Sequence, residues 1–185
     1  WVGTDGGLQN YTDNRWTTYS AADGLPHDRV LAGVVDVEGI VWVGTPGGLG
    51  RFDGSDWRAF GAPDGLAQNR VISLALGADG HIWAGTERSG VSRFDGRVFQ
   101  TYDPRDGLAG GHVSSIHAGD GVYWFVTDGG LTRFAPRQPP AAPVVHLDAA
   151  IADRRYLPPA ALSLPSDLGL LAFEFHGLSF KTRAG

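Results

Sequence analysis

One short pattern recurs four times along this chain and constrains its fold more than any other feature. The copies are Trp1-Val2-Gly3-Thr4, Trp42-Val43-Gly44-Thr45, Trp83-Ala84-Gly85-Thr86 and Trp124-Phe125-Val126-Thr127. Successive tryptophans lie 41 residues apart. A fixed period of this length means that the chain repeats one structural unit, which packs against its neighbours. A residue present in every copy therefore builds the unit, and a residue that differs between copies is the better candidate for function.

Each unit is predicted to contain four short strands. The most complete copy has four apolar runs of strand length, at 71–76, 81–86, 90–94 and 98–102. Asp-Gly pairs lie between some of these runs, and glycine supplies the positive φ that a tight hairpin turn needs. Helical periodicity is absent. Four antiparallel strands in a period of about 40 to 45 residues are typical of a β-propeller blade, so we predict an all-β chain.

The four copies predict a partial propeller. The expected blades cover about residues 1–22, 23–63, 64–105 and 106–135. The first copy lacks its inner strand and the fourth lacks its outer strand. The chain has no methionine and begins inside a repeat, so we expect a piece of a longer protein whose complete propeller has about seven blades. Open strand edges at both ends favour assembly or aggregation.

The repeats end at a proline-rich segment, residues 136–143, where neither a helix nor a central strand can form. We interpret this segment as a linker. Beyond it, residues 144–147 and 170–176 have the pattern of strands. Residues 144–185 are therefore predicted to be the N-terminal part of a second β domain, an Ig-like β-sandwich.

The overall composition excludes several kinds of function. Hydrophobic residues make up 42% of the chain, enough for a packed core. The net charge is −5 and there is no basic run, so we expect no nucleic-acid partner. The chain has no cysteine, which excludes disulfides and thiolate metal sites. No apolar run approaches the ~20 residues of a spanning helix, so any contact with a membrane would come through a segment outside this sequence.

Residues 1–134 resemble the two-component regulator propeller family. Its repeat reads approximately Trp-x-Gly-Thr-x-x-Gly-Leu, then Arg-Phe, an aromatic strand, Asp-Gly-Leu and a valine that opens the next blade. Residues 42–71 and 83–113 carry this pattern most completely. The fourth copy departs from it at Val126, where glycine is usual, and this side chain should push the neighbouring backbone apart. Residues 143–180 are similar to the start of the triple-tyrosine β-sandwich domain that commonly follows such propellers.

The resemblance implies a sensor. Such propellers usually form the extracytoplasmic, periplasmic half of a hybrid histidine kinase or a related transducer in the inner membrane, and in several members the sensed ligand is an oligosaccharide. It therefore implies a non-catalytic ligand-sensing region with a small-molecule or oligosaccharide ligand, no cofactor, and a homodimer in the full-length receptor. Kinase and membrane segments would lie outside this sequence.

The residues that recur are predicted to be structural. The four tryptophans that open the repeats should pack between blades, each burying on the order of 200 Å². Glycine two residues later should permit close contact between sheets. The Arg-Phe pairs should place the phenylalanine in the core and the arginine along the blade surface.

Polar residues that differ between copies are the candidate ligand site. They lie just before the valine that opens each inner strand, on loops that should ring one mouth of the central channel, and they are His27, Asp28, Arg29, Gln68, Asn69, Arg70 and His112. Side chains on scaffold loops at a concave site can hydrogen-bond a ligand such as a sugar. They could equally cap strand ends and solvate the loops. The third copy also carries one additional residue near Glu87-Arg88-Ser89.

Two other classes of function remain as alternatives. A propeller enzyme acting on polysaccharide, a lyase or a hydrolase, could use His27 with Asp28 or His112 as an acid/base pair. However, the six histidines show no metal-binding spacing, and no nucleophile elbow or phosphate loop is present. We therefore predict no catalytic and no metal-binding residues. The other alternative is a scaffold whose blade face binds another protein.

Overall fold

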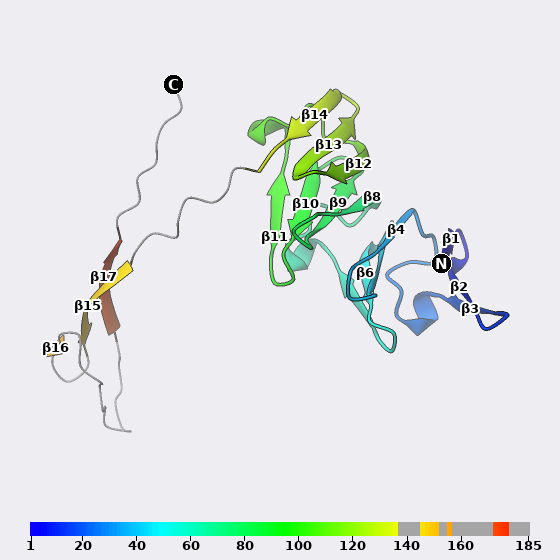
Figure 1. Ribbon diagram of the computed structural model, residues 1–185, viewed down its shortest axis with the longest axis horizontal. Helices are drawn as coiled ribbons and strands as arrows, with labels where there is room; N and C mark the ends of the chain where they lie inside the picture. The colour runs from blue at the N-terminus through cyan, green and yellow to red at the C-terminus, as the bar shows by residue number, and fades with distance from the viewer. Residues whose placement is uncertain (137–144, 152–154, 157–171, 178–185) are drawn as a thin grey trace. The chain divides into compact units, whose positions relative to one another are not determined.

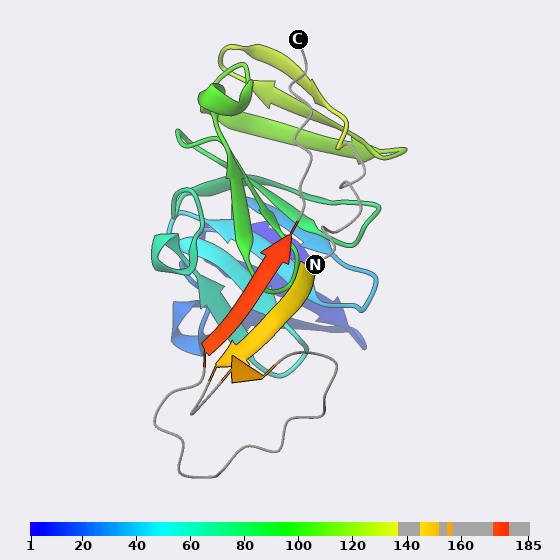
Figure 2. The same cartoon turned by 90° about the vertical axis from the view of Figure 1, so that its left-hand side faces the viewer.

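Short antiparallel strands joined by tight turns make up nearly all of the described chain. The computed structural model describes residues 1–136, 145–151, 155–156 and 172–177. The chain divides into two units, Trp1–Pro136 and Arg137–Gly185. Four sheets follow one another through the first unit in sequence order (Figures 1 and 2). Within the described residues, no helix has the length and apolarity needed to cross a membrane.

Each of the four sheets is one blade. Blades 2 and 3 have four strands each: β4 (Ala32–Val35), β5 (Val41–Thr45), β6 (Gly48–Phe52) and β7 (Trp57–Phe60), then β8 (Val71–Leu76), β9 (Ile82–Thr86), β10 (Val91–Phe94) and β11 (Phe99–Tyr102). Blades 1 and 4 have three: β1 (Val2–Thr4), β2 (Gly7–Thr12) and β3 (Arg15–Tyr19), then β12 (Val113–Gly119), β13 (Val122–Thr127) and β14 (Gly130–Phe134). All pairings are antiparallel, which confirms the all-β fold and the four-strand blades.

Glycine and valine make the close contact between blades. A Cβ placed on Gly44 would lie 2.7 Å from Val71 Cγ1, and one on Gly85 would lie 2.9 Å from Val113 Cγ1. Real Cβ atoms essentially never come so close, so only glycine lets the valine of the next inner strand approach. The predicted reason for this glycine is confirmed. At Val126, the side chain is 45% exposed and no described strand covers it, so the expected displacement of a neighbouring backbone has no counterpart here.

The aromatic core lies between blades. Trp42 and Trp83 are buried, at 4% and 0% exposure. The rings of Trp83 and Tyr123, in the next blade, have centroids 4.5 Å apart. The prediction that all four tryptophans are buried is wrong for Trp1 and Trp124, which are 45% and 36% exposed. Trp1 belongs to blade 1, which has no counterpart of the inner strand that pairs with Trp42 in blade 2, and no described blade covers the face of Trp124.

The Asp-Gly-Leu segments form one turn of 3-10 helix between successive blades. These turns are η1 (Ala21–Asp23), η2 (Ala62–Asp64) and η3 (Pro104–Asp106). In η1, Asp23 accepts a hydrogen bond from the Ser20 backbone N–H at 2.8 Å, and Gly24 has φ 106°. The leucine that follows each glycine is buried: Leu25, Leu66 and Leu108. This repeated element anchors the loops that carry the candidate site.

The second unit contains a three-stranded antiparallel sheet in the order β16-β15-β17. Its strands are β15 (Val145–Ile151), β16 (Arg155–Tyr156) and β17 (Ala172–Gly177). Two of them lie at or beside the predicted strands 144–147 and 170–176. The predicted linker lies outside the described residues except at Pro136.

Candidate functional site

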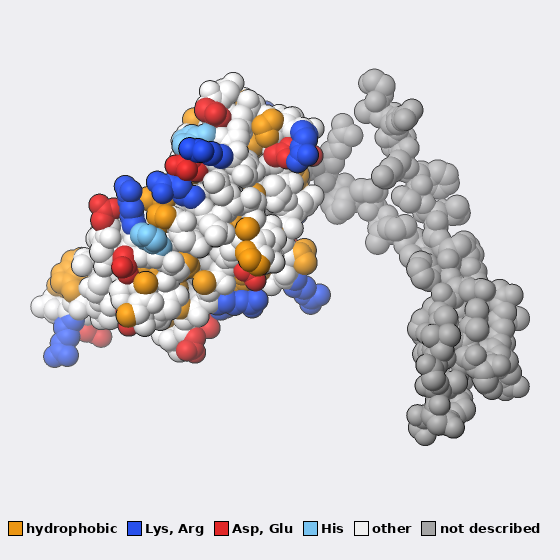
Figure 3. Space-filling view, turned by 180° about the vertical axis from the view of Figure 1, so that it is seen from behind, with side chains coloured by type: hydrophobic (Ala, Val, Ile, Leu, Met, Phe, Trp, Pro, Cys, Tyr) orange, Lys and Arg blue, Asp and Glu red, His pale blue; other side chains and the backbone are white. Residues whose placement is uncertain are grey.

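The predicted site residues share one edge of the first unit. In an antiparallel meander, the turns between the second and third strands of a blade lie on the same edge as the connections to the next blade. We call this edge the connection rim. The opposite edge carries the turns that join the first strand to the second and the third strand to the fourth, and we call it the hairpin edge. All seven predicted residues lie in connections between blades, and therefore on the connection rim. Figure 3 shows basic, acidic and histidine side chains interleaved along one edge of the first unit.

Asp28 and Asn69 make the same structural contact in successive copies. Asp28 Oδ1 accepts a hydrogen bond from the Ala21 backbone N–H at 2.7 Å, and Asn69 Oδ1 accepts one from Ala62 at 2.8 Å. Each side chain thereby satisfies an amide at the start of a 3-10 turn, where no backbone acceptor is available. These oxygens hold the connection in place, as the capping interpretation expects.

Arg29 and Arg70 form ion pairs on the rim. Arg29 Nε lies 2.8 Å from Asp5 Oδ1, in the preceding blade, and both side chains are at least half exposed. Arg70 Nε lies 2.8 Å from Glu87 Oε1, in its own blade. The Arg70 Nε–H is buried and makes no well-aligned hydrogen bond among the described residues. Its distance to Glu87 is short enough for a hydrogen bond, but the N–H does not point at the carboxylate oxygen. The two arginines occupy the same position of the repeat but reach in different directions.

The remaining three residues contact backbone groups. His27 Nδ1 accepts a hydrogen bond from the Arg29 backbone N–H at 2.9 Å. Gln68 Oε1 accepts one from the Arg88 backbone N–H at 3.0 Å, which ties one blade connection to the next turn. His112 Nδ1 lies 3.0 Å from the Glu87 carbonyl oxygen. In each case the other polar atom of the side chain, Nε2, has no described hydrogen bond with the protein.

A groove of about 570 Å³ opens on the connection rim next to Gln68, although none of the seven predicted residues is in its lining. It is lined by Ala67, Arg88, Ser89, Thr101, Asp103, Pro104 and Arg105. Arg105 Nε donates to Asp103 Oδ2 at 3.0 Å, and hydrogen bonds from Arg105 lower the pKa of the Asp103 carboxyl. Sequence reasoning missed Arg88 and Arg105. The additional residue near Arg88 in the third copy is the signal that points to this groove, because it changes a turn that the other copies keep short.

The rim offers hydrogen-bond donors and acceptors rather than a catalytic constellation. His27 lies in the connection to blade 2 and His112 in the connection to blade 4, and the contacts described above join neither of them to an activated nucleophile. Among the described residues, no three histidine, aspartate or glutamate side chains converge to hold a metal ion. The guanidinium, hydroxyl and carboxylate groups that line the groove suit a ligand that carries hydroxyl groups.

A second polar cluster lies on the hairpin edge between blades 3 and 4. Asp79 Oδ2 lies 2.6 Å from His81 Nδ1 and 2.9 Å from Arg93 Nη2, and Tyr123 donates a hydrogen bond to Asp79 Oδ1 at 3.2 Å. Partial burial opposes ionisation of Asp79, but hydrogen bonds from His81 and Arg93 hold its pKa well below the usual value. Burial also raises the pKa of the Tyr123 phenol. The cluster joins two blades and fills the space between them.

Comparison with known proteins gives one match to a family. The family described as two component regulator propeller matches at residues 65–88, the stretch that contains Gln68, Asn69 and Arg70. No curated protein matches the chain.

Solved structures also resemble the chain. Two are of an extracellular domain from B. thetaiotaomicron, described in one case as part of a hybrid two component system and in the other of a one component system. Their sequence identities are 18% and 17% and their TM-scores 0.41 and 0.40. The match covers 80% of this chain but 27% of each of theirs, so the chain spans only a minor part of their length. Similarity at this level does not carry function from one protein to another.

Proposed function

We propose that this chain is part of the extracytoplasmic sensing region of a signal-transduction receptor, and that the connection rim holds its ligand. The observation that carries the proposal is the family match at residues 65–88, since it falls on the repeat that carries Gln68, Arg70 and the enlarged turn at Arg88. The polar groove beside these residues supports a soluble ligand of small size.

The ligand class that fits this rim is a short oligosaccharide. Arg88 and Arg105 supply donors in a fixed planar arrangement, and Thr101 and Ser89 add hydroxyl groups to the groove lining. The side chains that fix the loops do so with one polar atom each, which leaves Nε2 of Gln68 for a ligand. The role is non-catalytic: it consists of binding, which is passed on to an output module, and a homodimer of the full-length receptor is the form in which we expect it to signal.

The test is a titration of the chain with defined neutral di- to hexasaccharides, followed by thermal shift and calorimetry. Gln68→Ala should weaken binding of a saccharide that the unchanged chain binds, because it removes both the amide donor and the contact that holds the enlarged turn. Arg15→Ala, an exposed change on β3, is the control and should leave binding unchanged. In the whole receptor, Gln68→Ala should also raise the saccharide concentration needed for the output response.

Two results would count against this proposal. Saccharide binding that survives combined changes at His27, Gln68, Asn69 and His112 would place the ligand elsewhere. Turnover of a saccharide during the titration, detected as new reducing ends, would favour the enzyme alternative.

A further inference from the structure

A second groove, of about 500 Å³, opens on the hairpin edge between blades 2 and 3. Its floor is aromatic and its border is charged; the residues that the argument uses are Trp42, Phe60, Phe94, Arg51 and Arg58. The volume lies in the range of small-molecule sites. The groove is formed by the turns within blades, at residues 36–38, 80 and 95–96, so it lies on the edge opposite the connection rim. It is a different site from the one proposed above.

Substitutions at repeated positions explain why this groove is open. Ile82 lines it, and the equivalent residue one repeat later is Tyr123, whose hydroxyl donates a hydrogen bond to Asp79 in the corresponding space between blades 3 and 4. Ile40 likewise stands where the next repeat has His81, which lies 2.6 Å from Asp79. The polar cluster that fills one interblade space is therefore missing from the other.

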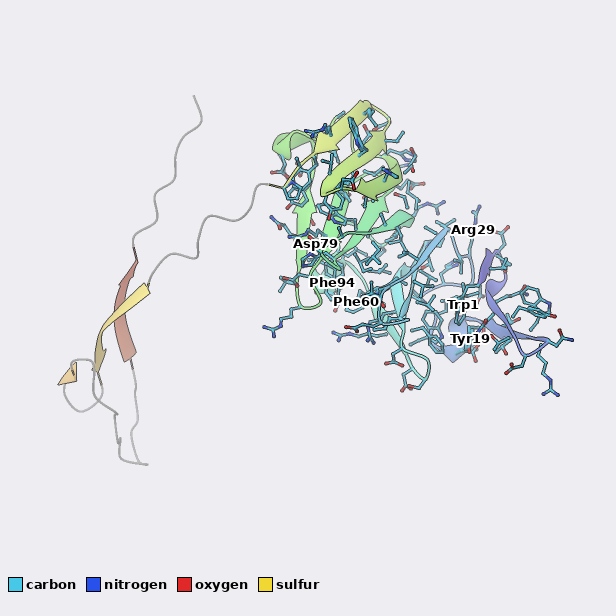
Figure 4. All side chains as sticks on the ribbon, viewed as in Figure 1. Trp1, Tyr19, Arg29, Phe60, Asp79 and Phe94 are labelled. Carbon is cyan, nitrogen blue, oxygen red and sulfur yellow. The ribbon has the colours of Figure 1, made fainter. Side chains whose placement is uncertain are left out.

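Two arginines cover the aromatic floor. The Arg51 guanidinium lies 6.0 Å from the centre of the Trp42 ring, and the Arg58 guanidinium lies 4.6 Å from the centre of the Phe60 ring. Trp42 and Phe60 stack at an angle of 21°. In Figure 4, Phe60 lies beside Phe94 of the next blade, and their ring centroids are 5.2 Å apart. The groove thus combines an apolar base with two cationic groups that can form bidentate hydrogen bonds.

The two arginines face one another across neighbouring strands. Arg51 on β6 and Arg58 on β7 are directly paired, and like charges in this position repel. Blade 3 avoids the repulsion, because Arg93 is paired with Gln100 and its charge is balanced by Asp79. Among the described blades, blade 2 has two arginines directly opposite one another on its third and fourth strands. An anion bound between the two guanidinium groups would relieve their repulsion.

Three carboxylates border the groove beside its two guanidinium groups, so selection of an anion would come from the placing of Arg51 and Arg58 and not from the total charge of the lining. Asp36 accepts hydrogen bonds from two backbone amides and from Trp42 Nε1, and Asp95 accepts two from its own turn. Glu38 is exposed, where solvent screens its charge. Arg51 Nη1 reaches Asp53 at 3.3 Å, and Arg58 has no ion pair within the part of the chain that the structure describes.

From these contacts we infer that the groove binds a small organic carboxylate with an apolar or aromatic body. The carboxylate lies between Arg51 and Arg58, and the body lies along the floor formed by Phe60, Phe94 and Trp42. The two cations select the charge, and the aromatic floor selects a ligand with an apolar face.

The test compares an acid with its uncharged amide on the 185-residue chain. Calorimetric titration with 3-phenylpropanoate should show binding, and 3-phenylpropanamide, which keeps the aromatic body, should bind at least about tenfold more weakly because it lacks the charge-assisted hydrogen bonds. Arg58→Gln should weaken binding of the acid by about tenfold or more. Arg15→Gln removes an exposed cation from β3, which lines neither groove, and should leave the affinity within about twofold.

A third variant tests the shape of the groove. Ile82→Tyr introduces the side chain found one repeat later and should abolish binding of the acid; because Ile82 is buried, its far-UV circular dichroism must match that of the unchanged chain for the result to count. The inference is overturned if the acid does not bind, if the acid and the amide bind equally, or if Arg58→Gln leaves the affinity unchanged. These measurements use a carboxylate and the hairpin edge, so their outcome is independent of saccharide binding at the rim.

Discussion

Replacing Trp83 with alanine should destabilise the first unit more than any other single change at the repeated tryptophans. Trp83 is fully buried and its ring contacts Tyr102, Tyr123, Phe125 and Phe134, with centroids 4.5 to 5.7 Å apart. A buried tryptophan removes about 200 Å² from water, which at about 25 cal/mol/Å² amounts to about 5 kcal/mol as an upper estimate. Measured losses for such truncations are about 3–5 kcal/mol, and we expect Trp83→Ala in this range.

Trp124 provides the matched control, because it occupies the same position of the next repeat. It is 36% exposed and no described blade packs on its face. Its removal leaves no closed cavity, so Trp124→Ala should reduce the free energy of unfolding by only about 1–2 kcal/mol. The two variants lose the same side chain, so the difference between their losses in free energy of unfolding measures the contribution of packing between blades.

Urea unfolding followed by far-UV circular dichroism measures both losses. The slope of the free energy against urea should stay the same in the two variants, so that the midpoint reports stability. Equal losses for Trp83→Ala and Trp124→Ala would refute the argument that packing between blades makes Trp83 the more stabilising of the two tryptophans. A loss below about 1 kcal/mol for Trp83→Ala would refute the assigned burial.

Three further changes test separate contacts, each by urea unfolding. Trp42→Phe should cost about 1 kcal/mol more than Trp83→Phe, because the Trp42 indole N–H donates to a carboxylate at 2.9 Å whereas that of Trp83 has no well-aligned acceptor among the described residues; equal costs would contradict this. Gly44→Ala should cost about 1–3 kcal/mol, since its Cβ would meet Val71 Cγ1 at 2.7 Å, and a neutral change would contradict the close contact. The depressed pKa of Asp79 means that its ionisation stabilises the fold above its unfolded value of 3.8 and that this stability is lost as the pH falls below it. Asp79→Asn should therefore flatten the acid side of a stability curve measured from pH 7 downward, and an unchanged acid limb would rule out this role.

The repeated residues predicted most of the fold. The strands expected at 71–76, 81–86, 90–94 and 98–102 each begin at or one residue before the observed strands, because Asp-Gly turns fix where a hairpin can reverse. The reason for glycine at the third position of the motif also followed from the repeat. Burial of all four tryptophans could not be predicted in the same way. The repeat indicates which residues one blade requires, but it does not indicate whether a neighbouring blade covers them.

The seven candidate residues lie in the connections between blades, but the contacts they make there were not predictable from residue type. Asp28 and Asn69 are both capping residues, and their equivalence is visible only when the amides they satisfy are known. Arg29 and Arg70 share a position and still choose different partners, because the first finds Asp5 in the preceding blade and the second finds an acid in its own. Whether they also contact a ligand remains the prediction that the saccharide titration tests.

The groove on the hairpin edge shows why sequence reasoning could not find both sites. A comparison at a spacing of 41 residues reveals that Ile82 is replaced by Tyr123, but the substitution matters only because blades pack face to face and the tyrosine hydroxyl reaches Asp79. Likewise, the spacing of seven residues between Arg51 and Arg58 does not indicate a contact. The two side chains form a like-charge pair only because the register of β6 and β7 places them opposite one another. A repeat keeps the fold constant, so a loss of one polar cluster opens a cavity instead of collapsing the blade. For this reason, functional sites in such a protein should be sought at positions that differ between repeats, and each such residue should be considered together with the residues that it contacts in the neighbouring blade.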